Sequence, residues 1–193
     1  MEDRRVVFDL QKKLTKLGHT VHIVSCDNEY NTNKQLNKIV NATNKINPDL
    51  LISIHLNSFH DPSANGVEVY HHPTSTKGKE YAEKVQRQLV TMSYTDRGVK
   101  SADFVVLRDT VCPAILVECG FITSKHDMAI FDPSVIADKI IYAITGEIVY
   151  NEIAKDIFYR VIAGSYKDKN NALRVEKELK EKGYNAFLEA KEV

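Results

Sequence analysis

The amino-acid sequence predicts an α/β protein: a three-layer sandwich with a mostly parallel, twisted sheet and helices on both faces, followed by a small C-terminal β-α-β unit. Residues 50–58 and 113–121 each contain a continuous aliphatic run bounded by turn residues, which is typical of a strand buried on both faces. Segments with apolar residues at helical spacing separate such runs. Alternating strands and helices indicate right-handed crossovers and a sheet covered on both sides.

The first half of the chain is expected to form two helices and three strands. Apolar residues recur every three or four positions in the helices, whereas the strands alternate or are continuously aliphatic. Gly18 ends the first helix, and Asn47 followed by Pro48 ends the second. The predicted helices are residues 5–17 and 35–46, and the predicted strands are residues 19–24, 50–58 and 66–70.

The second half continues the alternation with three helices and two strands. Asp132, which precedes Pro133 and Ser134, is expected to cap the last and longest helix. That helix carries an apolar stripe that one face of a sheet would bury. The predicted helices are residues 77–92, 127–131 and 135 to about 154, and the predicted strands are residues 104–108 and 113–121.

Composition limits the partners and the compartment. Lys plus Arg equals Asp plus Glu at 26 each in 193 residues, so the charge balance favours neither nucleic acid nor an anionic membrane. No apolar stretch approaches the roughly 18 residues that span a bilayer, and no apolar core follows the charged first residues, so we expect neither a membrane span nor a signal peptide. Cys26, Cys112 and Cys119 cannot all pair, which favours synthesis in a reducing cytoplasm.

Two predicted strand ends carry side chains suited to metal-assisted hydrolysis. His55 and Glu118 follow the aliphatic runs, and open α/β sheets bind ligands at the carboxyl ends of their strands. Hydrolysis by a zinc-activated water needs an imidazole ligand and a carboxylate base or acid. Taken singly, a histidine here is more often a rim residue, and a glutamate more often faces water. Asn57 faces the same side as His55 and could orient the ligand or bind a peptide, while Arg108 is either a carboxylate-binding residue or a plain surface arginine.

The residues around these positions resemble a known family. Residues 53–58 (Ser-Ile-His-Leu-Asn-Ser) resemble the Ser-Ile-His-x-Asn signature of the zinc-dependent type-3 N-acetylmuramoyl-L-alanine amidases, and residues 117–121 resemble their Val-Glu-x-Gly-Phe signature. Residues 97–108 resemble the family's "Arg-Gly-Val-Lys … Leu-Arg" segment. The resemblance runs from about residue 2 to about residue 149.

The resemblance implies a peptidoglycan hydrolase that cleaves the amide bond between N-acetylmuramic acid and the L-alanine of the stem peptide. Zinc (Zn2+) would activate a water, His55 would be a zinc ligand, and Glu118 would take the proton of the water and pass it to the leaving amine. Asn57 and Arg108 would bind substrate. A thiol nucleophile at Cys119, beside Glu118, is a minority alternative because it would need a histidine such as His55.

The start of the chain departs from the family pattern. Family members begin with a strand that ends in Gly-His-Gly or similar, whose histidine is the first zinc ligand, and a glutamate at the start of the first helix is the second. The helix register places that glutamate just before Met1 rather than at Glu2. We therefore expect residues 1–151 to be an N-terminally incomplete amidase domain with weak zinc affinity, although Glu2 stays open as a ligand.

Residues 156–193 resemble the first half of a SPOR domain, which recognises glycan strands stripped of their peptides. The expected elements are strands at residues 158–166 and 183–188 and a helix at residues 169–182. Such a unit has too small a core to stand alone, so we expect it to pack on the amidase or to form a homodimer through a second copy.

Two other functions remain open. One is a non-catalytic peptidoglycan-binding or regulatory fragment of such an amidase, which the missing ligands favour. The other is a flavodoxin-like binding domain, which the lack of a glycine-rich phosphate loop disfavours. A protein made in the cytoplasm without a signal peptide would act on the bacterial cell wall as a phage endolysin or an autolysin; phage lysis, sporulation and cell separation remain alternatives.

Overall fold

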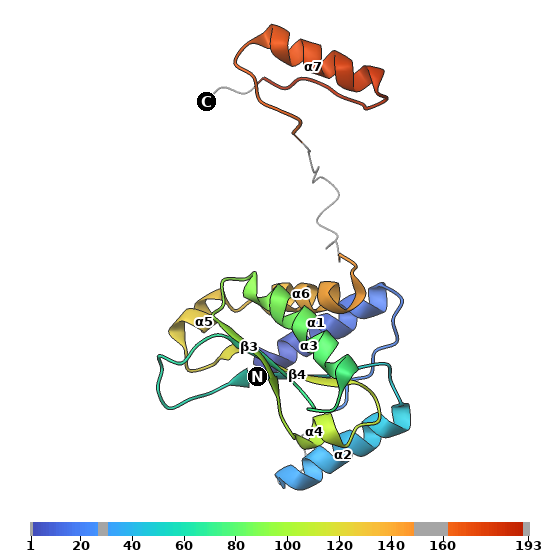
Figure 1. The fold of residues 1–193 in the computed structure, drawn as a ribbon, viewed down its shortest axis with the longest axis vertical. Coiled ribbons are helices and arrows are strands. Elements are labelled where there is room, and N and C mark those ends of the chain that lie inside the picture. The colour runs from blue at the N-terminus through green and yellow to red at the C-terminus, as the bar shows by residue number, and fades with distance from the viewer. Residues whose placement is uncertain (1, 27–30, 149–161, 191–193) are drawn as a thin grey trace. The chain divides into compact units, whose positions relative to one another are not determined.

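The computed structural model describes residues 2–26, 31–148 and 162–190 (Figure 1). The chain divides into two compact units, Met1–Tyr150 and Asn151–Val193. Within the described residues, no helix combines the length and apolar character that crossing a membrane requires.

The first unit is built on a mixed four-stranded sheet with the strand order β1-β4-β2-β3. β1 (Leu51–Asn57) is parallel to β4 (Ala114–Phe121), and β2 (Val67–His71) is parallel to β3 (Asp96–Ser101). The central pair, β2 and β4, is antiparallel. Among the described strands, β1 and β3 therefore form the two edges.

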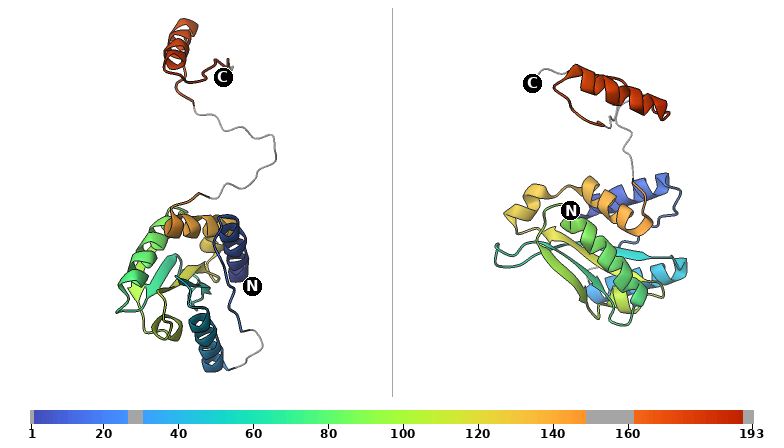
Figure 2. Two further views of the ribbon diagram at one scale, coloured as in Figure 1. Left: turned by 90° about the vertical axis from the view of Figure 1, so that its right-hand side faces the viewer. Right: turned by 45° about the horizontal axis from the view of Figure 1, so that its top comes forward.

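Helices cover both faces of this sheet, which confirms the predicted three-layer α/β class (Figures 1 and 2). α1, α3 and α6 bury their apolar stripes in the main core, against side chains such as Val69, Ile115 and Val117. α2 and α4 pack on the other face, against Ala114 and Leu116. The helices of this unit are α1 (Glu2–Lys16), α2 (Thr32–Ile46), α3 (Thr76–Val90), α4 (Val105–Arg108), α5 (Lys125–Ile130) and α6 (Pro133–Thr145).

Capping residues explain where several helices begin and end. The side chain of Asp132 accepts hydrogen bonds from the backbone N–H groups of Ser134 and Val135, as predicted for the start of α6. Gly146, in the left-handed conformation with φ +77°, ends α6. The predicted helix was therefore wrong at residues 146–148, because the apolar periodicity continued past a residue that terminates the helix; residues 149–154 lie outside the described residues.

Two predicted elements differ from the structure, and one strand of the structure was not predicted. Residues 19–24 form no strand; they pair with no neighbouring strand, and four of the six are exposed. Residues 104–108 were predicted as a strand but form the short helix α4, in which Val106 and Leu107 pack on Leu116. A four-residue apolar run has no period that separates helix from strand. Conversely, the strand β3 was not predicted, since Gly98 (φ +80°) and polar side chains interrupt its pattern.

The second unit contains one helix in its described part, α7 (Lys169–Glu181). Asp168 caps it by accepting hydrogen bonds from the N–H groups of Asn170 and Asn171. Residues 162–166 and 183–188 form no strand, which contradicts that part of the predicted β-α-β unit; residues 158–161 lie outside the described residues. None of residues 162–190 is buried. The large apolar side chains exposed here are Ile162, Tyr166, Leu173, Tyr184, Phe187 and Leu188.

Candidate functional site

A row of polar side chains crosses three strands of the sheet. His55 of β1 is paired with Glu118 of β4, and Glu118 is also paired with Glu68 of β2. Residues directly paired across neighbouring strands project from the same face. α2 and α4 cover this face around Leu116, and Glu118 lies two residues further along β4. Among the residues predicted for the site, the sheet thus brings His55 and Glu118 together.

Glu118 occupies surroundings that disfavour its charge. Its Oε2 is buried and has no hydrogen-bond partner among the described residues. Burial, and then the negative charge of Glu68, raise the pKa of the Glu118 carboxyl to about 7. A carboxyl group with that pKa can both accept and donate a proton near neutral pH, which a general base and acid must do.

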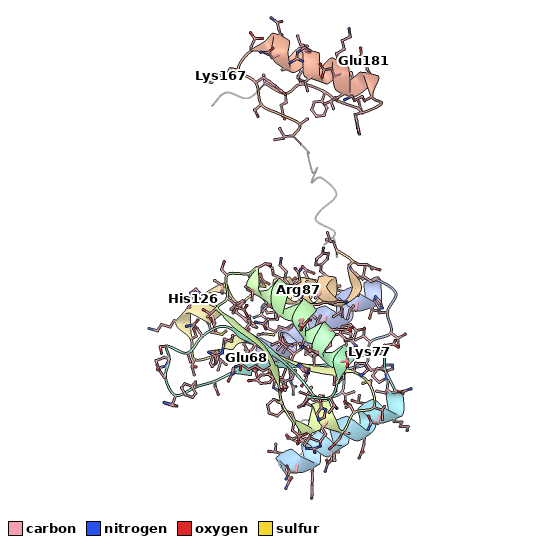
Figure 3. The ribbon with its side chains drawn as sticks, viewed as in Figure 1. Glu68, Lys77, Arg87, His126, Lys167 and Glu181 are labelled. Atoms are coloured by element: carbon pink, nitrogen blue, oxygen red, sulfur yellow. The ribbon has the colours of Figure 1, made fainter. Side chains whose placement is uncertain are left out.

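Glu68 is the member of the row that the sequence argument missed (Figure 3). It is 2% exposed, and its carboxylate accepts hydrogen bonds from Tyr70 Oη at 2.7 Å, Arg97 Nε at 2.8 Å and Lys100 Nζ. Burial alone would raise the pKa of Glu68, but the hydrogen bonds from Lys100, Arg97 and Tyr70 outweigh it and hold the pKa below its ordinary value. The available signal was a glutamate between Val67 and Val69 in an alternating strand, since a carboxylate in a buried strand needs partners.

Asn57 belongs to the same network. Its Nδ2 donates to Glu68 Oε1 at 3.1 Å, and its Oδ1 accepts from the backbone N–H of Ser58 at 2.8 Å. The side-chain amide is therefore fixed one strand away from Glu118, on the face that the sequence predicted. Its predicted contact with substrate stays a prediction.

Arg108 lies outside this network. It ends α4, where it forms ion pairs with Asp103 at 3.2 Å and Asp109 at 2.7 Å. These two carboxylates raise the pKa of the Arg108 guanidinium further above its ordinary value. No contact in the described part of the chain joins Arg108 to the row, because the segment expected to deliver it as a strand end folds as a helix instead.

The surroundings of His55 favour the neutral form of its imidazole ring. Its Nε2 shares a hydrogen bond of 2.9 Å with Ser53 Oγ. The packing around the ring lowers the pKa of His55, and the charge of Asp3 on α1 opposes this. A neutral imidazole is the form that binds metal ions.

The described residues alone do not complete a zinc site. They contain no group of three or more His, Cys, Asp or Glu side chains placed to hold a metal ion. Glu2, the alternative ligand, forms an ion pair with Arg5 at 2.7 Å. His55 is therefore the one predicted ligand that the structure places beside Glu118.

Cys119 faces away from this row. It is 1% exposed and packs in the main core with Val117, on the face opposite His55 and Glu118. Burial, followed by the charges of Glu118 and Asp3, raises the pKa of the Cys119 thiol. Neither its position nor its protonation favours the nucleophile alternative.

A tight bend follows Glu118. Gly120 has φ +125°, and the pairing of β1 with β4 shifts register between His55 and Asn57. Asp127 Oδ2 accepts the backbone N–H groups of both Phe121 and Gly66 at 2.8 Å. This carboxylate thus ties the chain just after Glu118 to the chain just before Glu68.

Comparisons with known proteins agree with this geometry. Residues 3–150 match the family described as N-acetylmuramoyl-L-alanine amidase, and residues 137–188 match the SPOR domain. The amidase LytC of Bacillus subtilis (strain 168) is 33% identical over 146 residues, which are 74% of this chain and 29% of that protein. The first curated relatives are longer: the chain spans between 20% and 61% of their length.

Solved structures support the same assignment. The catalytic domain of CD27L, an endolysin targeting Clostridia Difficile, has a TM-score of 0.70 and 25% identity and covers 76% of this chain and 83% of that one. An N-acetylmuramoyl-L-alanine amidase from Clostridium difficile 630 has a TM-score of 0.65 and 31% identity, covering 74% and 79%. The chain belongs to the N-acetylmuramoyl-L-alanine amidase family.

Proposed function

We propose that this chain is a peptidoglycan hydrolase that cleaves the amide bond between N-acetylmuramic acid and the L-alanine of the stem peptide. The observation that carries the proposal is Glu118: a half-buried carboxyl with a pKa of about 7, beside a neutral imidazole, in a domain of the amidase family. The cell wall is then its place of action, as a phage endolysin or as an autolysin.

The row supports a two-step role for Glu118. In its ionised form Glu118 accepts a proton from the attacking water as the C–O bond forms. It then donates that proton to the leaving nitrogen of L-alanine as the C–N bond breaks, which returns Glu118 to its starting state. Asn57, fixed by Glu68, is proposed to donate a hydrogen bond to the peptide.

Zinc is proposed as the cofactor, with His55 as the ligand that this strand contributes. Support comes from the neutral imidazole and from the resemblance of residues 53–58 to the zinc-binding signature. The described residues do not complete a three-ligand group; a bound zinc would supply the activation of the attacking water. Arg108 is retained as a proposed substrate-binding residue at a distance from the row.

The test is the release of L-alanine amino termini from purified cell walls, in buffer with excess zinc. Glu118→Gln keeps the size of the side chain but removes the proton acceptor, so the rate should fall by about 100-fold or more. The wild-type rate should rise with pH through about 7 as Glu118 ionises. Equal rates for the two proteins would exclude Glu118 as the base.

A second candidate function is wall binding without hydrolysis. The observation that favours it is the absence of a three-ligand metal group among the described residues. A wild-type chain that sediments with cell walls, yet releases no new amino terminus, would support this alternative over the enzyme.

The second unit is proposed to bind glycan and to form a homodimer. Residues 137–188 match the SPOR domain, and the described residues 162–190 expose large apolar side chains such as Phe187 and Ile162 without burying any residue. Pairing with a second copy would bury this surface, because in a two-fold symmetric dimer the same patch of both copies forms the interface.

A further inference from the structure

We propose that Arg97 and Lys100, which converge on Glu68 at the edge of the sheet, form a binding site for a carboxylate of the peptide part of the substrate. This inference rests on the proposed function and names the residues that would select an acidic stem peptide. It extends the site from the reacting bond to a second recognition point on the same face.

The charges at this edge do not balance. Arg97 and Lys100 both donate to the single carboxylate of Glu68. That carboxylate also accepts hydrogen bonds from Tyr70 and Asn57, so its lone pairs are occupied. The two cationic side chains are 35% and 38% exposed, whereas the Glu68 side chain is 3% exposed. One buried anion thus orients two cations and leaves positive charge in excess, facing solvent.

The remaining donors are held in a fixed orientation. Arg97 uses Nε for Glu68, and its Nη1 reaches the carbonyl of Asn65 at 3.4 Å. Its guanidinium lies over the ring of Phe121, 4.9 Å from the centroid, which restricts the plane of the group. A planar guanidinium held by stacking and by these two hydrogen bonds still presents N–H groups to a second carboxylate.

The spacing of the strands fits a stem peptide. Glu118 lies on β4, and the two cations lie on β3, two strands away. Neighbouring strands are about 4.8 Å apart, so the cations lie roughly 10 Å from the proposed reacting bond. An extended peptide advances about 3.3–3.6 Å per residue, so a carboxylate on the second or third residue of the stem would reach them.

The experiment measures equilibrium binding to the whole chain by calorimetry, with N-acetylmuramoyl-L-alanyl-D-isoglutamate and its amide, the D-isoglutamine form. Zinc is left out and Glu118→Gln is used as the background, so that no hydrolysis occurs. A tripeptide pair, with the third-residue carboxylate free or amidated, tells the two sources of the carboxylate apart. With Arg97 and Lys100 unchanged, the protein should bind one of the free carboxylates about tenfold more tightly than the corresponding amide.

Three variants separate recognition from stability. Lys100→Gln, which leaves Arg97 on Glu68, should lower the preference severalfold, whereas Arg87→Gln on the far side of the sheet is the matched control and should not. Glu68→Gln frees both cations and should increase the preference. A merely structural role of these residues predicts no such opposite shifts.

The outcomes are distinct. Equal binding of carboxylate and amide in both pairs would overturn this inference and leave the proposed hydrolysis intact. Failure to bind any of the four ligands would contradict the inference and the proposed function together. A preference that survives in Lys100→Gln with Arg97→Lys would assign the selectivity to other residues.

Discussion

At the scale of single residues, Glu118 combines a buried carboxyl oxygen with a negative charge on the neighbouring strand. Its unpaired Oε2 is buried and Glu68 lies on the neighbouring strand, so the folded protein holds a proton on Glu118 up to a pH of about 7. The unfolded chain releases that proton near its ordinary pKa of 4.5. Between these values the folded state binds more protons than the unfolded state, so stability falls as the pH rises.

Glu118→Gln should remove this pH dependence. The neutral amide has no proton to lose. As the pH rises from 5 to 8, the free energy of unfolding of the variant should therefore increase relative to that of the wild type, by about 3 kcal/mol at most. Urea unfolding of both proteins at pH 5 and pH 8, with a chelator present, measures the difference. Stability curves that stay parallel across this range would mean that Glu118 is not a buried carboxyl of raised pKa.

Cys119→Ala tests the alternative nucleophile. The thiol lies in the core on the face opposite Glu118, so its loss should cost about 1 kcal/mol of stability through lost packing while the rate per folded molecule stays within severalfold of wild type. Thiol labelling of the native protein should leave Cys119 unmodified while Cys26, which is partly exposed, reacts. Complete loss of activity in a stably folded variant would revive the cysteine mechanism.

At the scale of elements, the bend after β4 fixes the site. Asp127, 1% exposed at the start of α5, accepts two backbone N–H groups, one from each segment that leads to the row. Ser124 in turn caps α5 by accepting the N–H of Asp127 at 3.2 Å. A Cβ at Gly120 would lie 3.3 Å from Asp127 and from Tyr94, so the bend and the carboxylate fit each other closely.

Asp127→Ala should therefore be more harmful than an ordinary surface change. Two buried N–H groups lose their acceptor, which should cost roughly 2–4 kcal/mol, and the rate should fall because Glu118 and Glu68 lose their common support. Asp127→Asn keeps one oxygen and should be milder. The comparison is Asp61→Ala, in an exposed turn, where thermal unfolding should hardly shift. An equally mild Asp127→Ala would remove its positioning role.

Local patterns in the sequence predicted the helices and strands that show a clear period of apolar residues. The long amphipathic helices were located, except for the end of α6, to within a few residues, and His55 and Glu118 were predicted near the ends of two strands because aliphatic runs precede them; the pairing of those two strands is a finding of the structure. The network around Glu68 could not be predicted in this way. It exists because β2 runs antiparallel to β4, and that alignment depends on contacts between residues about fifty positions apart. The strand predicted at residues 104–108 was wrong because so short a segment shows no period that separates a strand from a helix.

At the scale of the whole molecule, the two units differ in how they bury apolar surface. The first unit has an apolar core on each face of the sheet, with α1, α3 and α6 packed on one face and α2 and α4 on the other. The described part of the second unit has one amphipathic helix, whose surface carries ion pairs such as Arg174 with Glu178 at 3.1 Å. Pairs of that kind contribute little stability, so burial of the exposed apolar side chains against a second copy would add to it.

The second unit should consequently bring chains together. Sedimentation of the whole chain should show a dimer that dissociates on dilution, and a version ending at Asn151 should be monomeric. Phe187→Ser, at an exposed apolar position, should weaken the dimer, whereas Lys177→Ser on the charged side of α7 should not. Monomers at all concentrations in both proteins would refute the dimer.

Zinc retention tests the molecule as a metalloprotein. With His55 as the single predicted ligand placed beside Glu118, dialysis against buffer without metal should leave well below one zinc per chain. His55→Ala should lower the remaining zinc further, and His60→Ala, in an exposed loop, should not. One zinc that resists dialysis would show that further residues, such as Glu2, join His55 in binding the ion.

The mixed direction of the sheet has a consequence for how the specificity of such a domain can change. β1 is parallel to β4 and β2 is antiparallel to it, so β1 ends and β2 begins beside the same end of β4. Residues 58–66 therefore connect Asn57 to Glu68 across the strand that carries Glu118. Both ends of this bridge are anchored, by the Asn57–Glu68 hydrogen bond and by Asp127 on Gly66. The exposed segment between them, including Phe59, should therefore tolerate a change of length or sequence without moving the row of His55, Glu118 and Glu68.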